Sequence, residues 1–254
     1  MANRTEIMDA ISSAFVNKDY ALAFWQGGSA AFNRLDEWSD LDVVLVVKDD
    51  CEQEAMQVAT QLLQRNFGIE DKFEIDPPHW PGMVQTFFRL KNTSPFLLVD
   101  FSILRQSANE KFSEPEIHGN AVVVFDKQEV LKTQPVNLPE LYSTLKVRIA
   151  KQQKRFAFFS TLVDKEINRG KEVDAFIFYW SYSLSPLIEI LRIKHSPYHW
   201  NWGMRYLKED LTAPVYKQLQ PLFFVKDMDD LIAKNELCRS WFNNACKEVT
   251  NSLL

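Results

Sequence analysis

The chain is poor in cysteine, and the cysteines that it has form no pattern. Cys51, Cys238 and Cys246 are scattered over 254 residues and include no Cys-x-x-Cys pair. An odd and scattered set argues against a disulfide framework and against a cysteine-based zinc site. Free cysteines are typical of proteins in a reducing compartment, so we expect a cytoplasmic protein.

The sequence also lacks a long hydrophobic run. Its most apolar stretch, FIFYWSYSLSPLIEIL from Phe176, is too short to cross a bilayer and contains Pro186 and Glu189. The first fifteen residues carry Glu6 and Asp9 and no extended apolar region, so they do not have the pattern of a signal peptide. The sequence therefore predicts no membrane partner.

An excess of positive charge is absent as well. The formal net charge is −5, which argues against an extended nucleic-acid partner, because such binding depends on many contacts of Lys and Arg with phosphates. Residues 1–134 hold 12 Lys and Arg against 21 Asp and Glu, whereas residues 135–254 hold 17 against 13. Two interpretations stay open: solvated faces that differ by chance, or an acidic metal-holding half and a basic half that meets anionic phosphates.

Internal repeats and low-complexity segments are also missing, and 46% hydrophobic and 25% charged residues are ordinary for a globular protein. The first half mixes two patterns. Apolar residues at a spacing of three or four predict helices, and short β-branched runs predict strands. The expected helices are 4–18 and 52–66, and the expected strands are 21–25, 43–47, 83–90, 96–104 and 121–125.

The second half has helical patterns almost throughout. After a linker at 126–139, helices are expected at 141–167, 174–195, 227–233 and 235–252, with shorter ones between them. Gly170 is a plausible stop for the first of them, and Pro186 predicts a kink in the second. The predicted fold class is therefore α+β: a mixed-sheet domain with helices over 1–130, followed by an all-helical domain over 138–254.

Two aspartates stand at the start of a strand that has the pattern of full burial. Asp40 and Asp42 lead into the run VVLVV at 43–47. Residues two apart in a strand point to the same side, so both carboxylates are expected to face one site. Two like charges held so near to each other are unfavourable in free energy unless a cation lies between them. Mg²⁺ prefers carboxylate oxygens as ligands. The alternative is that both acids are solvated and only cap the strand.

A glycine turn lies shortly upstream of this pair. Gly27, Gly28 and Ser29 precede a short helical pattern, so their free backbone N–H groups are placed to bind phosphate oxygens. Glycine also lets the backbone approach such a ligand closely. Ser29 has the alternative role of a helix N-cap. Turn and aspartate pair together predict a site for a metal ion and a phosphate.

A third carboxylate supports this prediction. Asp100 is the only charge in the nine residues FLLVDFSIL, and a lone acid in an apolar strand is costly unless it is paired or bound to a metal. Two-metal sites for phosphoryl transfer need several carboxylates. Asp100 is therefore a candidate third ligand, with a satisfied buried acid as the alternative.

Together these residues resemble the signature of the DNA polymerase β-like nucleotidyltransferase superfamily: a Gly-Ser turn, an acid-x-acid pair at a strand start and a later acid on a neighbouring strand. The segment GGSAAFNRLDEWSDLD is most similar to the sequences of the bacterial small-molecule branch, the aminoglycoside adenylyltransferases and their relatives. The resemblance covers residues 25–48 and about 96–104, and the helical tail matches only in general type. Asn33 departs from it, because many relatives have glycine there.

The resemblance implies an enzyme, a nucleotidyltransferase that uses ATP and Mg²⁺, with two ions expected. A hydroxyl of a small-molecule acceptor would attack the α-phosphate, AMP would be transferred and pyrophosphate would leave. Asp40 and Asp42 would hold both metal ions, Asp100 would assist the attacking hydroxyl, and Gly28 with Ser29 would cradle the triphosphate. An aminoglycoside-like antibiotic is the leading acceptor, which implies a role in antibiotic resistance.

Two other functions stay open. The same chemistry could serve a toxin or regulator that nucleotidylates a protein or a tRNA end. The chain could also be a non-catalytic nucleotide-binding module, although the presence of all three acids counts against that.

Weaker candidates lie in the helical half. Lys151 shares a predicted helix face with Arg148 and Arg155, and it either reaches the β- and γ-phosphates or belongs to a solvated stripe. Candidates for the general base are Glu189, Glu166 and Asp174. For Glu189, an ion pair with Arg192, three residues on, is the competing prediction.

Overall fold

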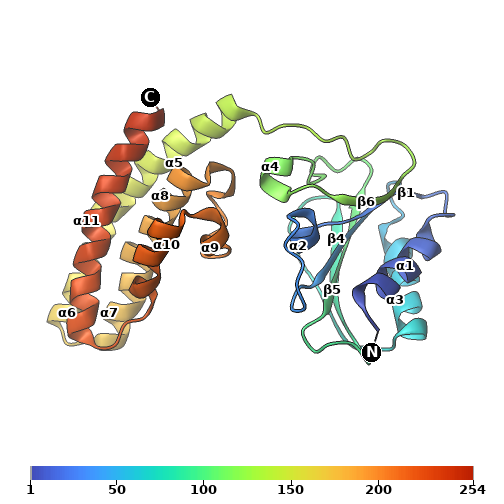
Figure 1. The fold of residues 1–254 in the computed structure, drawn as a ribbon, viewed down its shortest axis with the longest axis horizontal. Coiled ribbons are helices and arrows are strands. Elements are labelled where there is room, and N and C mark those ends of the chain that lie inside the picture. The colour runs from blue at the N-terminus through green and yellow to red at the C-terminus, as the bar shows by residue number, and fades with distance from the viewer. Residues whose placement is uncertain (1, 254) are drawn as a thin grey trace. The chain divides into compact units, whose positions relative to one another are not determined.

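The computed structural model describes residues 2–253, and the chain divides into two compact units, Met1–Val136 and Asn137–Leu254 (Figure 1). The first unit combines a mixed sheet with helices, and the second is helical, so the predicted α+β fold class is confirmed. The predicted domain limits, 1–130 and 138–254, and the role given to each domain remain predictions.

The first unit is built on one sheet of six strands. Their order is β3-β4-β5-β2-β1-β6, and β2 and β5 are parallel whereas the other neighbours are antiparallel. The strands are β1 Ala21–Gln26, β2 Leu41–Val47, β3 Ile69–Glu74, β4 Met83–Leu90, β5 Leu98–Arg105 and β6 Val122–Asp126. The helices are α1 Arg4–Phe15, α2 Gly28–Ala31, α3 Glu52–Asn66 and α4 Pro115–His118.

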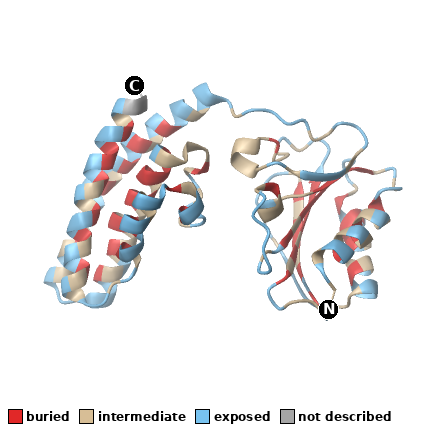
Figure 2. Ribbon diagram, in the orientation of Figure 1, coloured by how far each residue is buried: buried red, intermediate tan, exposed pale blue. Residues whose placement is uncertain are grey.

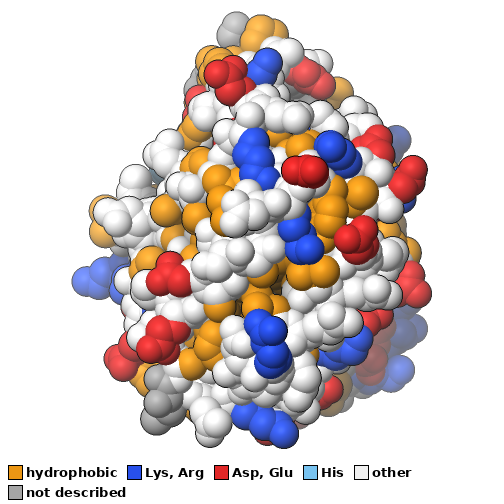
Figure 3. Space-filling view, turned by 90° about the vertical axis from the view of Figure 1, so that its right-hand side faces the viewer, with side chains coloured by type: hydrophobic (Ala, Val, Ile, Leu, Met, Phe, Trp, Pro, Cys, Tyr) orange, Lys and Arg blue, Asp and Glu red, His pale blue; other side chains and the backbone are white. Residues whose placement is uncertain are grey.

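Alternate residues of β2 enter two different cores. Leu41 and Val43 pack with side chains of α1 and α3, which cover one face of the sheet. Val44 and Val46 belong to a smaller cluster on the opposite face. Burial on both faces explains why the run is apolar without interruption, and Figure 2 shows buried residues along the strands. From the side on which α1 and α3 lie, charges of both signs are interspersed with hydrophobic side chains (Figure 3).

The second unit packs its helices around a separate hydrophobic core. They are α5 Leu138–Phe159, α6 Thr161–Asn168, α7 Glu172–Tyr179, α8 Ser185–His195, α9 Leu207–Asp210, α10 Ala213–Leu219 and α11 Met228–Leu253. A π-helical turn, Trp180–Leu184, joins α7 to α8, and single 3₁₀ turns lie at Pro197–His199 and Gln220–Phe223. Within residues 2–253, no helix has the length and hydropathy that a membrane span requires.

The prediction of one helix at 141–167 is wrong in one respect. The structure has two helices there, α5 and α6, with an interruption at Ser160. The carbonyl of Ser160 accepts hydrogen bonds from Arg239 Nη2 at 2.6 Å and from the backbone N–H of Val163 at 3.3 Å. The bond from Val163 spans three residues, as in a tight turn, and it lies where α5 gives way to α6. Arg239, on α11, contacts the chain at the same junction.

Two other helix boundaries also differ from the prediction. The helices expected at 227–233 and 235–252 form one continuous helix, α11. The helix expected at 174–195 changes to a π-helical turn just before Pro186, which occupies the first turn of α8. Proline has no N–H to give to the preceding turn, and in the first turn of a helix that N–H would be unpaired anyway.

Candidate functional site

Asp42 and Asp100 lie side by side on neighbouring strands. The strands β2 and β5 are parallel, and their register places Asp42 directly opposite Asp100. Both aspartates alternate with residues of the core under α1 and α3, so they point to the other face of the sheet, the face of Val44. Asp42 is the second residue of β2, because the strand begins at Leu41, two residues earlier than the sequence indicated.

Asp40 lies just before β2, and its charge, like that of Asp42, acts on Asp100. Its Oδ1 accepts a hydrogen bond from the backbone N–H of Leu98, at the start of β5, at 3.2 Å. The structure therefore brings all three predicted acids to the edge where β2 and β5 begin. Within residues 2–253, however, they do not form a group of three whose ligand atoms all lie within 4.8 Å of one another.

The glycine turn contacts Asp42 directly. The N–H of Gly27 donates to the backbone carbonyl of Asp42 at 3.0 Å, which fixes the turn to β2. Gly28 has a φ of 54°, and a Cβ atom built on it would lie 1.9 Å from Oδ2 of Asp42. The carboxylate thus rests against the backbone of Gly28, and no other residue type fits there without a shift of Asp42.

Ser29 lies in the first turn of α2 with its hydroxyl unsatisfied. Its Oγ is buried and has no hydrogen-bond partner among residues 2–253. The N-cap of α2 is Gly27, without any side-chain hydrogen bond, so the alternative role of Ser29 as a helix N-cap is wrong. Buried polar groups normally have a partner, and an unpaired hydroxyl next to the Gly28 turn is suited to a ligand oxygen.

The surroundings of Asp100 disfavour the charged form of its carboxyl group. Burial raises its pKa from 3.8 to about 6, and the negative charges of Asp42 and Asp40 add to this. Hydrogen bonds from Gln85, at 2.8 and 2.9 Å, and from Ser102, at 3.5 Å, oppose the rise. An oxygen-rich set with a buried acid beside a second carboxylate fits a hard divalent cation such as Mg²⁺.

This pKa gives a pH-dependent stability in the metal-free protein. Because the pKa of Asp100 is higher in the folded state, the folded protein binds more protons than the unfolded chain between about pH 4 and pH 6. The free energy of unfolding therefore falls as the pH rises through this window, by on the order of 3 kcal/mol. We expect Asp100→Asn to remove that fall, as measured by urea unfolding in EDTA from pH 4 to pH 8. An unchanged slope in the variant would contradict the assignment.

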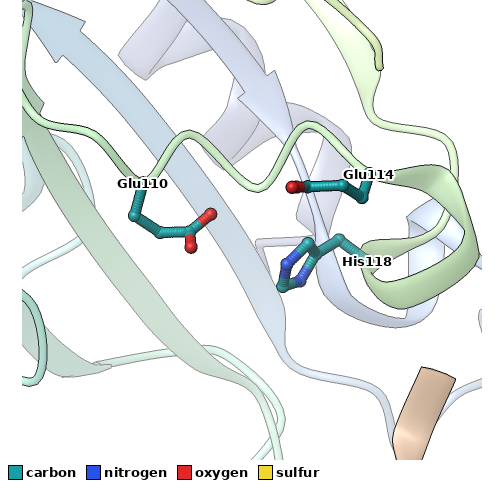
Figure 4. Close-up of side chains that lie close together, drawn as sticks. All are labelled: Glu110, Glu114 and His118. Carbon is teal, nitrogen blue, oxygen red and sulfur yellow. The ribbon is translucent and has the colours of Figure 1, made fainter. Parts of the chain in front are cut away.

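A second group of metal-ligand side chains was missed from the sequence. Within residues 2–253, ligand atoms of Glu110, Glu114 and His118 all lie within 4.8 Å of one another, and their polar ends converge (Figure 4). The segment is attached to α2, since the N–H of Asn120 donates to the carbonyl of Ala31 at 2.8 Å. The spacing of four residues between these three side chains was visible in the sequence. However, α4 covers only the last four residues of the segment 110–118, so the three residues do not share one face of a helix, and helical periodicity would not have predicted this arrangement.

An exposed aromatic pair stands beside Asp40. Trp38 and Phe96 contact each other edge to face, with ring centroids 4.8 Å apart, and both are more than half exposed. The loop before Asp40 is held by Asp36, which accepts from the backbone N–H of Trp38 at 3.1 Å and from Ser39 Oγ at 2.6 Å. The hydrogen bond from Ser39 is the largest cause of the lowered pKa of Asp36. Aromatic faces at such a place are suited to stacking with a planar or apolar ligand group.

In the second unit, Glu189 has a different partner from the one expected. It forms a bidentate ion pair with Arg148 and also accepts a hydrogen bond from Gln152, so the predicted pair with Arg192 is wrong. Arg148 lies over the ring of Trp200 at 5.6 Å. Arg148, Glu189 and Trp200 line a cavity of about 260 Å³ in this unit.

The other candidates of the second unit are dispersed. Glu166 is buried and pairs with Arg169 at 2.8 Å, whereas Asp174 is exposed at the start of α7. Lys151 is exposed on α5. Glu166 and Glu189 are both held in ion pairs, so either would have to leave its partner before it could accept a proton from a substrate.

No protein-family model and no curated protein matches the chain. Among solved structures, an aminoglycoside 6-adenyltransferase from Bacillus subtilis is similar, with a TM-score of 0.39 and 14% identity over 100% of this chain and 92% of the other. A STING-associated CdnE c-di-GMP synthase from Capnocytophaga granulosa has a TM-score of 0.31 and 13% identity, over 98% of this chain and 79% of the other. The name of the first neighbour is that of the enzyme group which the Gly-Ser and Asp-x-Asp segments resemble.

Proposed function

We propose that this chain is a Mg²⁺-dependent nucleotidyltransferase that moves AMP from ATP to a hydroxyl group of a small molecule. One observation carries the proposal: the Gly28 backbone lies against the carboxylate of Asp42, which in turn lies beside Asp100. A phosphate-binding turn and a pair of acidic ligands thereby share one site. The same arrangement counts against a nucleotide-binding module without activity.

Each residue has a defined task in this proposal. Asp40 and Asp42 would bind the metal ions, and Asp100 would assist the attacking hydroxyl. The Gly28 backbone and the Ser29 hydroxyl bind phosphate oxygens. When bound, Mg²⁺ neutralises charge on the phosphates and lowers the pKa of a coordinated hydroxyl.

The proposed reaction is a displacement at the α-phosphorus of ATP. The acceptor oxygen forms a bond to this phosphorus, the bond to the β-phosphate oxygen breaks, and pyrophosphate leaves. The hydroxyl proton passes to a base, for which Asp174, Glu166 and Glu189 remain candidates. Lys151 remains a candidate for binding the β- and γ-phosphates. The leading acceptor is an aminoglycoside-like antibiotic, because the wording of the Gly-Ser and Asp-x-Asp segment is most similar to that branch.

The experiment that tests this proposal measures pyrophosphate release from MgATP in the presence of aminoglycosides, bulk tRNA or lysate protein, with Asp42→Asn as the control. Release with aminoglycosides that is lost in the variant supports the proposal. Release with tRNA or protein alone would keep the chemistry and replace the acceptor. ATP binding without release in any arm would contradict a catalytic function.

Gly28→Ala should weaken Mg²⁺-dependent ATP binding by about tenfold or more. The added methyl group would meet Asp42 Oδ2 and also require a left-handed alanine, and each such strain costs about 1–3 kcal/mol. Calorimetry with ATP and Mg²⁺ measures the change. Gly27→Ala is the matched control, because nothing lies within 4 Å of a Cβ at that position. Equal affinities for the two variants would argue against a phosphate-binding turn at Gly28.

A further inference from the structure

Gln85 lies between Asp100 and the loop that precedes β4. Its side chain is buried, and its Nε2 donates to both carboxylate oxygens of Asp100, at 2.8 and 2.9 Å. Its Oε1 faces Nδ1 of His79 at 3.2 Å. One amide thus connects a candidate metal ligand on β5 with a side chain of the loop before β4.

The chemistry of these groups fixes the direction of both hydrogen bonds. An ionised carboxylate only accepts, so Gln85 must present its NH₂ group to Asp100. Its carbonyl oxygen then faces His79 and needs a donor, so the hydrogen of the imidazole must lie on Nδ1. A flipped amide would place its carbonyl oxygen against the carboxylate, where two acceptors repel. His79 therefore keeps Gln85 in the orientation that serves Asp100.

We propose that Gln85 and His79 are positioning residues that hold the Asp100 carboxylate in the orientation needed to bind a metal ion. This inference rests on the proposed function of the aspartate site. A carboxylate that is gripped at both oxygens by one amide cannot rotate freely, so it is presented to an ion in one plane. Partners of this kind orient metal ligands, and their loss lowers metal affinity by about 10- to 100-fold.

The neighbouring residue Thr86 allows this role to be separated from a structural one. Thr86 is as well buried as Gln85 on the same strand, but it pairs with Phe101, which belongs to the core under α1 and α3. Side chains alternate along a strand, so Thr86 points away from Asp100. A general loss of packing in β4 would affect both positions, whereas a loss of positioning would affect Gln85 alone.

The test is the Mg²⁺-dependent affinity for a non-transferable ATP analogue with a methylene group between the α- and β-phosphates. It is measured by calorimetry at about pH 8, well above the pKa of Asp100, with thermal unfolding as a check of folding. Gln85→Leu removes both donors at similar volume and is expected to weaken Mg²⁺-dependent binding by about 10- to 100-fold. Binding of the analogue in EDTA should not change, and Thr86→Val should behave like the wild-type protein.

The exposed position of His79 supplies a second series with little risk to folding. His79→Phe removes the Nδ1 donor and is expected to weaken Mg²⁺-dependent binding, by less than Gln85→Leu does. His79→Asn restores a donor at nearly the same place and should recover the wild-type affinity. If Gln85→Leu and Thr86→Val bind alike, or if His79→Asn fails where His79→Phe fails, the positioning role is wrong although the proposed function stands. If the wild-type protein shows no Mg²⁺-dependent binding, both fall.

Discussion

Asp42→Asn is expected to lower the rate of pyrophosphate release from MgATP by about a thousandfold while the protein stays folded. Asparagine has the shape of aspartate and can occupy the space beside Gly28, but it lacks the negative charge that balances a metal ion. Metal-ion catalysis of this kind is worth several kcal/mol, and 1.36 kcal/mol corresponds to a factor of ten in rate. Steady-state assays at saturating MgATP, with the best acceptor of the panel, measure the loss.

The matched control for this variant lies a few residues upstream. Asp36→Asn makes the same chemical change in the same segment, but Asp36 is exposed and its carboxylate bonds to Ser39 and Trp38 within its own loop. Its activity should stay within a few-fold of the wild-type value. A rate for Asp42→Asn within tenfold of that control would show that Asp42 does not bind a catalytic metal ion.

The contact on which this expectation depends was only partly accessible from the sequence. The spacing of Asp40 and Asp42 before an apolar run predicted a shared side, and the lone charge of Asp100 in its strand marked a third acid. The register that sets Asp42 opposite Asp100 depends on the parallel pairing of β2 with β5, which lie more than fifty residues apart. Period-two patterns identify the faces of a strand but not its partner.

The polar residues around the acids left a weaker signal. Gln85 is one amide in the strand MVQTFFRL, and nothing local to it indicates that it donates to Asp100. The strand β3 was not predicted, because its sequence, IEDKFE, offers no apolar face and the strand lies exposed at the edge of the sheet. Charged residues are common in edge strands, because they discourage pairing of the strand with other chains.

Ion-pair partners were the least predictable feature. The spacing of three residues along a helix favoured an ion pair between Glu189 and Arg192, because these residues are neighbours on the helix surface. The structure instead pairs Glu189 with Arg148 on α5, and it turns Arg192 into the protein interior. Which charge is buried depends on the packing of several helices, and helical periodicity within one element carries no information about that.

Loss of the buried Arg192 should have the largest effect on stability. Its side chain is fully buried, and it pairs with Asp210 Oδ2 at 2.5 Å and donates to the carbonyls of Gly203, at 2.7 Å, and Arg205. Arg192→Leu leaves the buried carboxylate of Asp210 with His199 as its remaining partner in this network and leaves the loop carbonyls unpaired. Breaking a buried ion pair on one side costs about 3–5 kcal/mol, so urea unfolding should show a loss of that size.

The same helix provides the comparison that identifies the cause. Lys194→Met removes an ion pair with Glu248 that is solvent-exposed, and such pairs contribute about 0–1 kcal/mol. If the cost at Arg192 comes from an uncompensated buried charge, the double variant Arg192→Leu with Asp210→Leu should be more stable than Arg192→Leu alone, because it removes both charges. If the double variant is no more stable, the cost comes from the unpaired carbonyls of the loop before α9. The main role of Arg192 would then be to hold this loop in place through hydrogen bonds.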